Sequence, residues 1–486
     1  MIFFRLFLFL LLPLVSLVAK PKKHDVVAGK VDISSRDQTT IVHQKTHKAI
    51  VHWDSFSIEQ GESVHIEQPS SKSAILNRVT GKDPSEVHGI LSSTGKVFLL
   101  NKNGIVIGPQ GRVNTAGFIA STLELKDSEF LSDGPLLFSG DSDQSIINLG
   151  KIETHFGNLF ILAQRVENQG ILKAEQGVVQ VAGAREVLLK EDSAEPIYIR
   201  PQSEGVVINE GSIEGLSVIV KAAGENAYAL ALNQEGFIQA TGVQSEGGQV
   251  FLVAEKGITQ VSGEIRAIKG DGSGGTVHIL GDQVGLIENA IVDVSAPNHG
   301  GEVLIGGDYQ GSNEAIRNAE IAYVGEHAQV LAHSTEHGAG GKVIVWGDQS
   351  SSHLGWIDVN GSHRGGFIEV SSPGHLCYRG NVDLSSKWGE PGELLLDPSD
   401  ITIGNFSGAG SSNPSFPTGP NEYNPSGSSG NLAVADLMNG LNSGNVTLLT
   451  TGGAGGSGNV AFNSGINLTW NTATTFSIVT TGTIGL

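Results

Sequence analysis

Pairs of adjacent glycines recur along this chain at a nearly constant spacing, and each pair precedes a short run of aliphatic residues. From Gly247 to Gly392 the successive spacings are 27, 26, 40, 25 and about 26 residues, and Pro391 replaces the first glycine of the last pair. One interval, around residues 309–337, carries an insertion. A fixed period of 20–50 residues predicts a solenoid or an array of repeated units.

Each unit carries short segments in which aliphatic and polar residues alternate. GGTVHILGD from Gly274 and GGEVLIGGD from Gly300 are two such segments, and a second strand such as AIVDVSAP from Ala290 follows in the same unit. Alternation with period 2 predicts strands with one buried face. Two or three short strands per unit of about 25 residues favour a parallel β-helix, in which stacked coils align Val, Ile and Leu inside.

This fold class also assigns a position to the glycines. The glycines are expected at corners, where the backbone adopts left-handed dihedral angles. A β-propeller is the structural alternative, but its blades need about 40–50 residues and four strands. The fold class predicted from the sequence is therefore an all-β, parallel β-helix solenoid.

The first 19 residues have the composition of a secretory signal peptide. Arg5 precedes an apolar run from Leu6 to Val18, and the small residue Ala19 follows, although the cleavage position is uncertain. The run is short for a membrane-spanning helix, and a retained N-terminal anchor is the alternative. We expect the mature chain to be exported and to be either soluble or bound to a surface by other means.

The rest of the chain divides into four segments by composition. A solenoid exposes strand edges at its ends, and the region before the repeats, with its apolar anchors Trp53, Phe56 and Ile58, is expected to form an N-terminal cap. The predicted segments are an N-terminal cap at 20–150, repeats at 151–403, a Pro/Ser/Gly/Asn loop or linker at 404–431, and further strand repeats at 432–486, which end without an evident cap and suggest a truncated chain. A short helix is expected at Leu432 to Leu441.

Charge and cysteine content exclude some partners and cross-links. The chain has 50 acidic and 30 basic side chains and a net charge of −20. Nucleic acids require basic surfaces, so no nucleic-acid partner is expected. Cys377 is the single cysteine and cannot form a disulfide within the chain.

The segment VFLLNKNGIVIG, from Val97 to Gly108, contains an unusually polar turn. Asn-Gly between aliphatic runs is a strong turn signal because both residues tolerate positive φ. The side chains of Asn101 and Asn103 are expected to hydrogen-bond to neighbouring backbone groups and lock the turn. From these residues alone, an ordinary corner is the simpler interpretation.

A longer stretch closely resembles a known family. The run SAILNRVTGKDPSEVHGILSSTGKVFLLNKNGIVIGPQGRVNTAGFIASTLEL, Ser73 to Leu125, resembles the filamentous-haemagglutinin N-terminal secretion domain. That domain belongs to the exoproteins of two-partner secretion in Gram-negative bacteria. The resemblance implies that residues 20–150 are the secretion domain, and that the protein is exported through the periplasm and is then secreted or associated with the cell surface at the outer membrane. VVAGKVDIS, KAIVHWDSFSI and ESVHIEQPSS fit the same pattern upstream in the same order, and the resemblance covers roughly residues 26–403.

The resemblance implies a right-handed parallel β-helix and one dedicated partner, an outer-membrane β-barrel transporter that recognises the N-terminal domain through its periplasmic domains. The family has a characteristic Asn-Pro-Asn-Gly-Ile turn, and the matching residues here are Asn101, Lys102, Asn103, Gly104 and Ile105. Lys102 stands where the family has proline. We call these five residues the recognition turn, because the resemblance implies that the transporter recognises this domain. A lysine has more conformational freedom to lose than a proline, at a cost of up to ~1 kcal/mol. The remaining residues of the cap and secretion-domain motif are Trp53, Asn77, Arg78 and Gly81.

The function expected from these features is that of a non-enzymatic exoprotein. We expect an adhesin or haemagglutinin-like protein that serves cell adhesion and virulence by binding a host glycan or a host protein receptor. A carbohydrate-active β-helix enzyme, a polysaccharide lyase or hydrolase, is the main alternative, and a truncated remnant is another.

Residues suited to catalysis or metal binding do not form a recognisable motif. The carboxylate pairs Asp141/Asp143 and Asp397/Asp400 lie beside turns, where aspartate is common for local hydrogen bonding. His43 and His47 have i, i+4 spacing, which would place both on one face of a helix. The residues just before them, Thr39 to Val42, predict a strand, so this spacing does not form a helical metal-binding face. We therefore predict no catalytic residue, no cofactor and no metal site.

Overall fold

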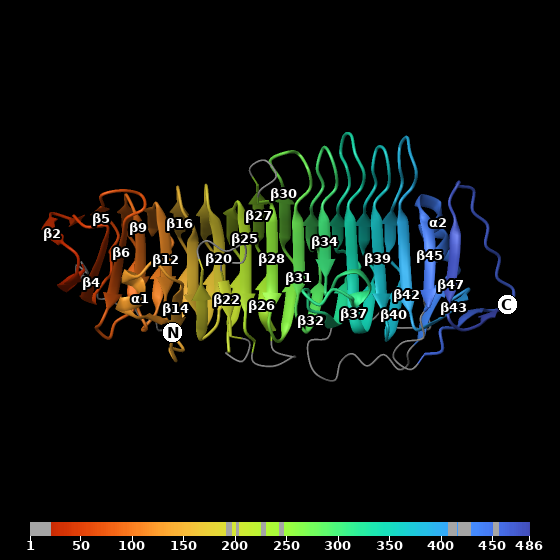
Figure 1. The fold of residues 1–486 in the computed structure, drawn as a ribbon, viewed down its shortest axis with the longest axis horizontal. Coiled ribbons are helices and arrows are strands. Elements are labelled where there is room, and N and C mark those ends of the chain that lie inside the picture. Colours follow the sequence, from red (N-terminus) through yellow and green to blue (C-terminus); the bar gives the residue numbers. More distant parts are fainter. Residues whose placement is uncertain are drawn as a thin grey trace, which may run out of the picture.

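The chain winds into a right-handed parallel β-helix, seen side-on in Figure 1 as a row of stacked coils. The computed structural model describes residues 21–190, 197–200, 204–224, 230–242, 247–406, 416, 429–450 and 456–486. The predicted signal peptide, residues 1–19, lies outside the described residues, as does most of the predicted linker at 404–431. Within the described ranges, neither helix has the length and apolar character needed to cross a membrane.

Each coil contributes strands to three faces, here named A, B and C. Parallel ladders join equivalent strands of successive coils, and the long strand β37 belongs to both face A and face C, so that these two faces are continuous. Face A contains β4 (Lys48–Ser55), β6 (Ala74–Val79), β9 (Lys96–Leu100), β12 (Gly117–Ser121), β17 (Leu159–Ala163), β20 (Val178–Gly183), β25 (Ser217–Ala222), β28 (Gln249–Ala254), β31 (Thr276–Leu280), β34 (Glu302–Ile305), β37 (Lys342–His353), β39 (Phe367–Ser372), β42 (Glu393–Pro398), β45 (Asn445–Thr450) and β47 (Phe476–Thr480).

Faces B and C are built from shorter strands. Face B contains β3 (Thr39–Gln44), β5 (Ser63–Glu67), β8 (Ile90–Ser93), β11 (Arg112–Thr115), β16 (Lys151–Thr154), β19 (Ile171–Ala174), β24 (Ser212–Gly215), β27 (Phe237–Thr241), β30 (Glu264–Ile268), β33 (Ile291–Asp293), β36 (Gln329–Leu331), β38 (Trp356–Asp358) and β41 (Asn381–Asp383). Face C contains β7 (Ser85–Val87), β10 (Ile105–Ile107), β15 (Ser145–Asn148), β18 (Arg165–Asn168), β23 (Val206–Asn209), β26 (Leu230–Gln234), β29 (Ile258–Val261), β32 (Gln283–Leu286), β35 (Ala319–Val324) and β40 (His375–Tyr378).

The aliphatic side chains align inside the solenoid as the alternation predicts. One row of fully buried residues follows face A from coil to coil, because the ladders place each member opposite the next. This row confirms the predicted interior stack, and its members from the cap onward are Ala49, Ile75, Val97, Phe118, Leu159, Val179, Val218, Val250, Val277, Val303, Val343, Ile368 and Leu394.

The glycine pairs have a different role from the one expected. Of the pairs from Gly247 to Gly366, only the first has positive φ, so the expectation of left-handed corners is wrong for the others. A Cβ at Gly341 would lie 2.1 Å from the carbonyl oxygen of Gly301, and one at Gly366 would lie 2.2 Å from that of Gly341. Glycine is required there because successive coils approach too closely for any side chain.

The first coils are closed by antiparallel strands, as the cap hypothesis requires. β1 (Lys22–Ala28) pairs antiparallel with β4, and β2 (Val31–Arg36) pairs antiparallel with β3. Trp53, Phe56 and Ile58 are buried beneath them. The free ends of faces A and B are therefore covered by strands of opposite direction, which confirms the N-terminal cap.

An extra element, not expected from the sequence, lies on the outer side of face A. It consists of β13 (Glu124–Leu125), α1 (Asp127–Leu131), β14 (Leu136–Ser139), β21 (Glu186–Leu189) and β22 (Ile197–Ile199), whose strands form one antiparallel sheet. Outward side chains of face A, including Leu76, Phe98 and Phe160, pack against this element in a second apolar core. We call it the outer module; it leaves the coils at the corner between faces A and C.

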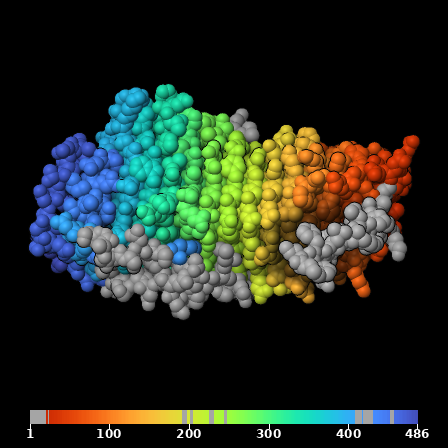
Figure 2. Space-filling model, turned by 180° about the vertical axis from the view of Figure 1, so that it is seen from behind, coloured from red at the N-terminus to blue at the C-terminus, as the bar shows by residue number. Residues whose placement is uncertain are grey.

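The later coils instead project long loops. Between face B and face A, the loops at 269–275, 294–301, 332–341, 359–366 and 384–392 rise above the coils in Figure 1 and form the raised part of the surface in Figure 2. We call these five loops the crest. The turn η1 (Tyr309–Gly311) lies within the insertion expected near residue 309.

The last described part contains the predicted helix. α2 (Val434–Ser443) overlaps the expected segment Leu432 to Leu441 and buries Leu437 and Leu441. A second small sheet flanks it, formed by β43 (Asp400–Gly404), β44 (Ser429–Ala433), β46 (Val460–Phe462) and β48 (Ile484–Gly485).

Candidate functional site

The predicted recognition turn connects β9 on face A to β10 on face C. The Gly104 amide donates to the Asn101 carbonyl over 3.1 Å, which closes a four-residue turn. Gly104 has φ of 108°, whereas Asn103 does not have positive φ. The turn is thus a corner between two faces rather than a hairpin, and only its glycine uses the left-handed freedom that was expected of both residues.

The side chain of Asn101 lies at the centre of a hydrogen-bonded network. It is 1% exposed. Its Nδ2 donates to the carbonyl of Asp83 and to Oγ of Ser85, each at 3.0 Å. Its Oδ1 accepts from the backbone amide of Asn103 at 2.9 Å and from the side-chain amide of Asn103 at 3.0 Å. The predicted locking of the turn by asparagine is present.

Asn103 links this turn to the preceding coil. Its Nδ2 donates to the carbonyl of Gly81 at 2.9 Å. A Cβ on Gly81 would lie 1.9 Å from the carbonyl oxygen of Asp54, so no side chain fits there. Gly81 follows β6, and the backbone amide of the neighbouring Thr80 donates to the carbonyl of Trp53 at 2.7 Å. Three successive coils are therefore joined at one corner.

Trp53 and Asn77 support this corner from inside the solenoid. Nε1 of Trp53 donates to Oδ1 of Asn77 at 3.0 Å, and Nδ2 of Asn77 donates to the carbonyl of Phe98 at 3.3 Å. Both side chains are buried, so each of these polar groups needs its partner. The Trp53 ring also meets Phe56 edge-on, with centroids 5.4 Å apart.

Arg78 points to the opposite side of the same strand and fastens the outer module. Its guanidinium donates to the carboxylate of Glu124, to the carbonyl of Leu125 and to Oδ1 of Asp127. The side chain is only 13% exposed. These partners lie 46 to 49 residues further along the chain, so no local pattern in the sequence identifies them.

Lys102 forms the exposed apex of the turn, whereas Ile105 is fully buried behind it. The carbonyl of Lys102 accepts a hydrogen bond from Oγ of Ser142 at 2.6 Å. Ser85 and Ser142 therefore support the turn although the sequence did not single them out. Of the nine predicted residues, eight lie on or shortly after the adjacent strands β4, β6 and β9, and Ile105 begins β10. Arg78 faces the outer module, whereas the others gather at or beneath one polar corner.

The other acidic side chains considered have different surroundings. Asp400 accepts the backbone amide of Asn459 at 2.6 Å and that of Ser457 at 3.1 Å. Burial raises the pKa of Asp397 to about 6. His43, on β3, lies 3.0 Å from the carboxylate of Glu67. Asp397 is thus a buried carboxyl group, whereas the carboxylate of Asp400 holds the backbone of the turn at residues 457–459.

Known protein sequences match the N-terminal half of the chain. A sequence model of the TPS secretion domain matches residues 18–267. A heme/hemopexin-binding protein of Haemophilus influenzae strain Rd is 30% identical over 251 residues, which is 48% of this chain and 27% of the relative. A second heme/hemopexin-binding protein of Haemophilus influenzae is 28% identical over 262 residues, or 48% of this chain and 28% of the relative. The match thus spans little more than a quarter of the length of these relatives.

A solved structure agrees over a longer stretch. The crystal structure of the HMW1 secretion domain from Haemophilus influenzae aligns with a TM-score of 0.67 and 29% sequence identity. The alignment covers 76% of this chain and 99% of that domain.

Proposed function

Because this chain belongs to the TPS secretion domain family, whose members are exoproteins secreted across the outer membrane with a partner transporter, we propose that the corner at Asn101–Ile105 is the feature by which the transporter selects it. The observation that supports this most is the network around Asn101. A buried side chain with four hydrogen bonds holds the turn while Lys102 stays exposed at its apex.

A rigid turn favours recognition because little conformational entropy remains to be lost on binding. The corner is fixed from three sides, by Gly81 on the preceding coil, by Ser142 on the following coil and by the interior pair of Trp53 and Asn77. The transporter would meet a preformed turn instead of a flexible loop.

Co-expression with the cognate β-barrel transporter tests this role. We expect the double variant Asn101→Ala/Asn103→Ala to accumulate inside the cell and its yield in the medium to fall at least tenfold. Asn114→Ala is the matched control, since Asn114 is exposed on the neighbouring strand β11. Secretion of the double variant at the level of the control would refute the assignment.

Outside the cell, we propose that the protein acts as a non-enzymatic, adhesin-like binder that presents the crest to a host glycan or protein. Trp388 at the crest is 64% exposed, and the ammonium of Lys387 lies 4.4 Å from its ring centroid. Tryptophan is enriched among the residues that carry most of the binding energy at protein interfaces. Binding to host cells should fall with Trp388→Ala and persist with Trp356→Ala, a change on face B; equal binding by both variants would contradict this role.

A second candidate function comes from the two relatives, both named for heme and hemopexin binding. Under this proposal the exported chain binds a host heme carrier. Surface-immobilised protein should then retain hemopexin in preference to serum albumin. Equal retention of the two would exclude the carrier and leave the adhesin proposal.

The enzyme alternative is tested by turnover. Both relatives are named as binding proteins, and we propose that this chain likewise binds a partner without catalysing a reaction. Incubation with acidic polysaccharides, with and without calcium, should release no product. Release that disappears with Asp397→Asn would establish the enzyme.

A further inference from the structure

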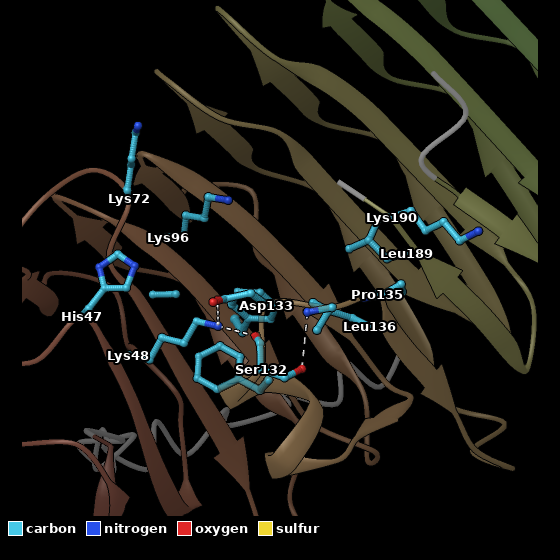
Figure 3. Close-up of a pocket in the computed structure, with 14 residues that line it drawn as sticks. His47, Lys48, Lys72, Lys96, Ser132, Asp133, Pro135, Leu136, Leu189 and Lys190 are labelled. Carbon is cyan, nitrogen blue, oxygen red and sulfur yellow. Dashed lines mark hydrogen bonds and ion pairs between the residues drawn. The ribbon is translucent and has the colours of Figure 1, made fainter. Parts of the chain in front are cut away.

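Two hollows that adjoin face A differ in character. The one in Figure 3 lies between face A and the outer module, and there the ammonium of Lys48 is held by the carboxylate of Asp133, 3.1 Å away, and by the carbonyl of Ser132. These contacts fasten the outer module to the coils. The other hollow, of about 710 Å³, is a groove at the foot of the crest.

Equivalent positions of successive coils build this groove. Its floor consists of the glycine pairs, among which Gly341 and Gly366 are half-buried and lack room for a side chain. Bridges and backbone hydrogen bonds join the crest loops along one wall, which contains Ser273, His299, Ala339, Arg364 and Glu390. The other wall is the first residue of each face A strand, namely Thr276, Glu302, Lys342, Phe367 and Glu393.

The groove runs straight along the solenoid axis. Its face A wall crosses β31, β34, β37, β39 and β42, each of which pairs with the next. Successive strands of a sheet lie about 4.8 Å apart, so this wall is about 19 Å long. These dimensions suit a straight chain whose repeating unit advances by one coil spacing.

The backbone of the floor has no free strand edge. The amide of Gly300 donates to the carbonyl of Ala339 at 3.0 Å, and that of Gly340 donates to the carbonyl of Arg364 at 2.9 Å. The next coil repeats this pattern. An extended peptide therefore cannot bind here as an added strand, because strand addition requires unpaired backbone groups at a sheet edge.

The charges of the two walls balance. The lining residues that the structure describes include three basic and three acidic side chains, which are Lys269, Lys342, Arg364, Glu302, Glu390 and Glu393. Nζ of Lys342 lies 3.1 Å from the carboxylate of Glu302 and 2.9 Å from that of Asp308. Balanced charge favours neither an anion nor a cation, whereas carboxylates and guanidinium groups accept from and donate to hydroxyl groups.

Phe367 adds an apolar surface to this polar groove. Its side chain is half-buried, and its ring centroid lies 6.0 Å from that of Tyr309, which is 45% exposed beside the groove. Aromatic rings offer a large flat apolar area. The C–H groups on the face of a sugar ring pack against such a surface, while the hydroxyl groups at the ring edge remain available for hydrogen bonds.

We propose that the groove binds an extended, neutral, β-1,4-linked glycan that lies along the solenoid axis. Such a chain advances by about one coil spacing per sugar, so successive sugars meet equivalent positions of successive coils. One sugar lies against Phe367, and hydroxyl groups of the chain bond to the charged side chains of both walls. The inference rests on the adhesin proposal for its biological role and names the class of ligand at the crest.

Calorimetric titration of the full purified chain tests the chemistry. Cellohexaose and N-acetylchitohexaose are straight and neutral, maltohexaose is neutral but coiled, hexagalacturonate is acidic, and decaproline is an extended peptide without hydroxyl groups. We expect at least one of the two straight neutral probes to bind at least tenfold more tightly than each of the other three. Equal affinity for maltohexaose, hexagalacturonate or decaproline would overturn the proposal.

Variants locate the site. Ala339→Trp obstructs the groove without changing its charge, and its bridge partner Arg364 is exposed, so the wall accommodates a large side chain. We expect this variant to weaken glycan binding at least tenfold. Thr335→Trp is the matched control, since Thr335 is exposed on the same crest loop and does not line the groove. Unchanged affinity of Ala339→Trp, or an equal loss in Thr335→Trp, would overturn the assignment.

A milder variant guards against misfolding. Phe367→Leu keeps an apolar side chain but removes the aromatic ring, and it should weaken glycan binding at least threefold. Thermal unfolding verifies the fold of each variant. If Ala339→Trp does not fold, unchanged affinity of a folded Phe367→Leu protein would overturn the assignment.

Two comparisons complete the test. Tighter binding of cellohexaose would identify a cellulose-like source of the glycan, tighter binding of N-acetylchitohexaose would identify a chitin-like source, and binding of neither would overturn the proposal. Host-cell binding that depends on Trp388, without affinity for either straight probe, would overturn this inference and leave the adhesin proposal. Affinity for a straight probe without host-cell binding would support the groove and overturn the adhesin proposal.

Discussion

Two strands at the same position in their coils, β17 and β28, differ in how much of each strand is buried. All five residues of β17, LFILA, are buried, whereas in β28, QVFLVA, every second residue is buried. Their interior rows are equivalent, because Leu159 and Val250 belong to the same fully buried stack. The difference lies outside the solenoid, where the outer module covers β17.

The outward row of face A makes the comparison specific. From coil to coil it runs through Phe98, Ile119 and Phe160, which the outer module covers, and then reaches Phe251 and His278, which are half-buried. Apolar side chains on both sides of a strand therefore mark the part of a solenoid that a second layer covers. Alternation marks the part whose outer side contacts solvent.

The largest expected effect separates two phenylalanines of this row, Phe160 and Phe251. Phe160→Ala should lower the free energy of unfolding by about 3–5 kcal/mol, because it leaves a cavity between two packed layers. Phe251→Ala should cost about 1 kcal/mol or less, because its ring is partly in water. Denaturant titration measures both, and equal losses would show that the outer module does not form a second core.

Further along the same row, Glu369 replaces the aromatic residues. It is fully buried, and its carboxylate accepts the amide of Gln310 at 3.1 Å. Burial raises the pKa of Glu369 from 4.5 to about 7, with hydrogen bonds from Ser371 and Gln310 opposing the shift. The folded state thus retains a proton that the unfolded chain loses, so this contribution to stability is complete below pH 4.5 and is lost as the pH rises through about 7.

Glu369→Gln should remove this pH dependence. Relative to the unchanged protein, the variant should gain about 2–3 kcal/mol in free energy of unfolding between pH 5 and pH 8. Asp397, whose raised pKa of about 6 has the same sign, remains in both proteins. Parallel stability curves for the two proteins over this range would show that Glu369 titrates normally.

Substitution of a glycine at the close contacts between the later coils should have an intermediate effect on the free energy of unfolding. Gly341→Ala should cost about 1–3 kcal/mol, because its Cβ would lie 2.1 Å from the carbonyl oxygen of Gly301 in the preceding coil and the two coils must separate. Gly140→Ala is the matched control, since the nearest atom to its Cβ lies 3.7 Å away. A thermal midpoint unchanged by Gly341→Ala would mean that the coils are not in close contact there.

The smallest effect concerns Lys102 in the N-terminal region. Lys102→Pro should stabilise the chain by about 0.4–1 kcal/mol, because proline restricts the unfolded chain at an exposed turn position. Replacing Lys126, which is also exposed, by glutamine should change stability by less. A loss of stability in Lys102→Pro would show that the turn does not have the backbone conformation proline requires.

The sequence predicted those features that depend on local patterns. The glycine period predicted the coils, the alternation around Val277 and Val303 predicted the interior row, and Asn101 and Asn103 predicted a locked turn. It did not predict the outer module, because the partners of Arg78 lie beyond any local window. Nor did it distinguish a glycine that needs positive φ, such as Gly104, from one such as Gly341 that lacks room for a side chain.

The most direct measurement of the proposed function is the affinity of the purified chain for the isolated periplasmic domains of its transporter. We expect Asn101→Ala/Asn103→Ala to weaken this binding at least tenfold, because each lost hydrogen bond in the buried network loosens the turn. Gly341→Ala, which disturbs the later coils, should bind as the unchanged protein does. Full affinity in the asparagine variant, or a loss confined to Gly341→Ala, would contradict recognition at the N-terminal corner.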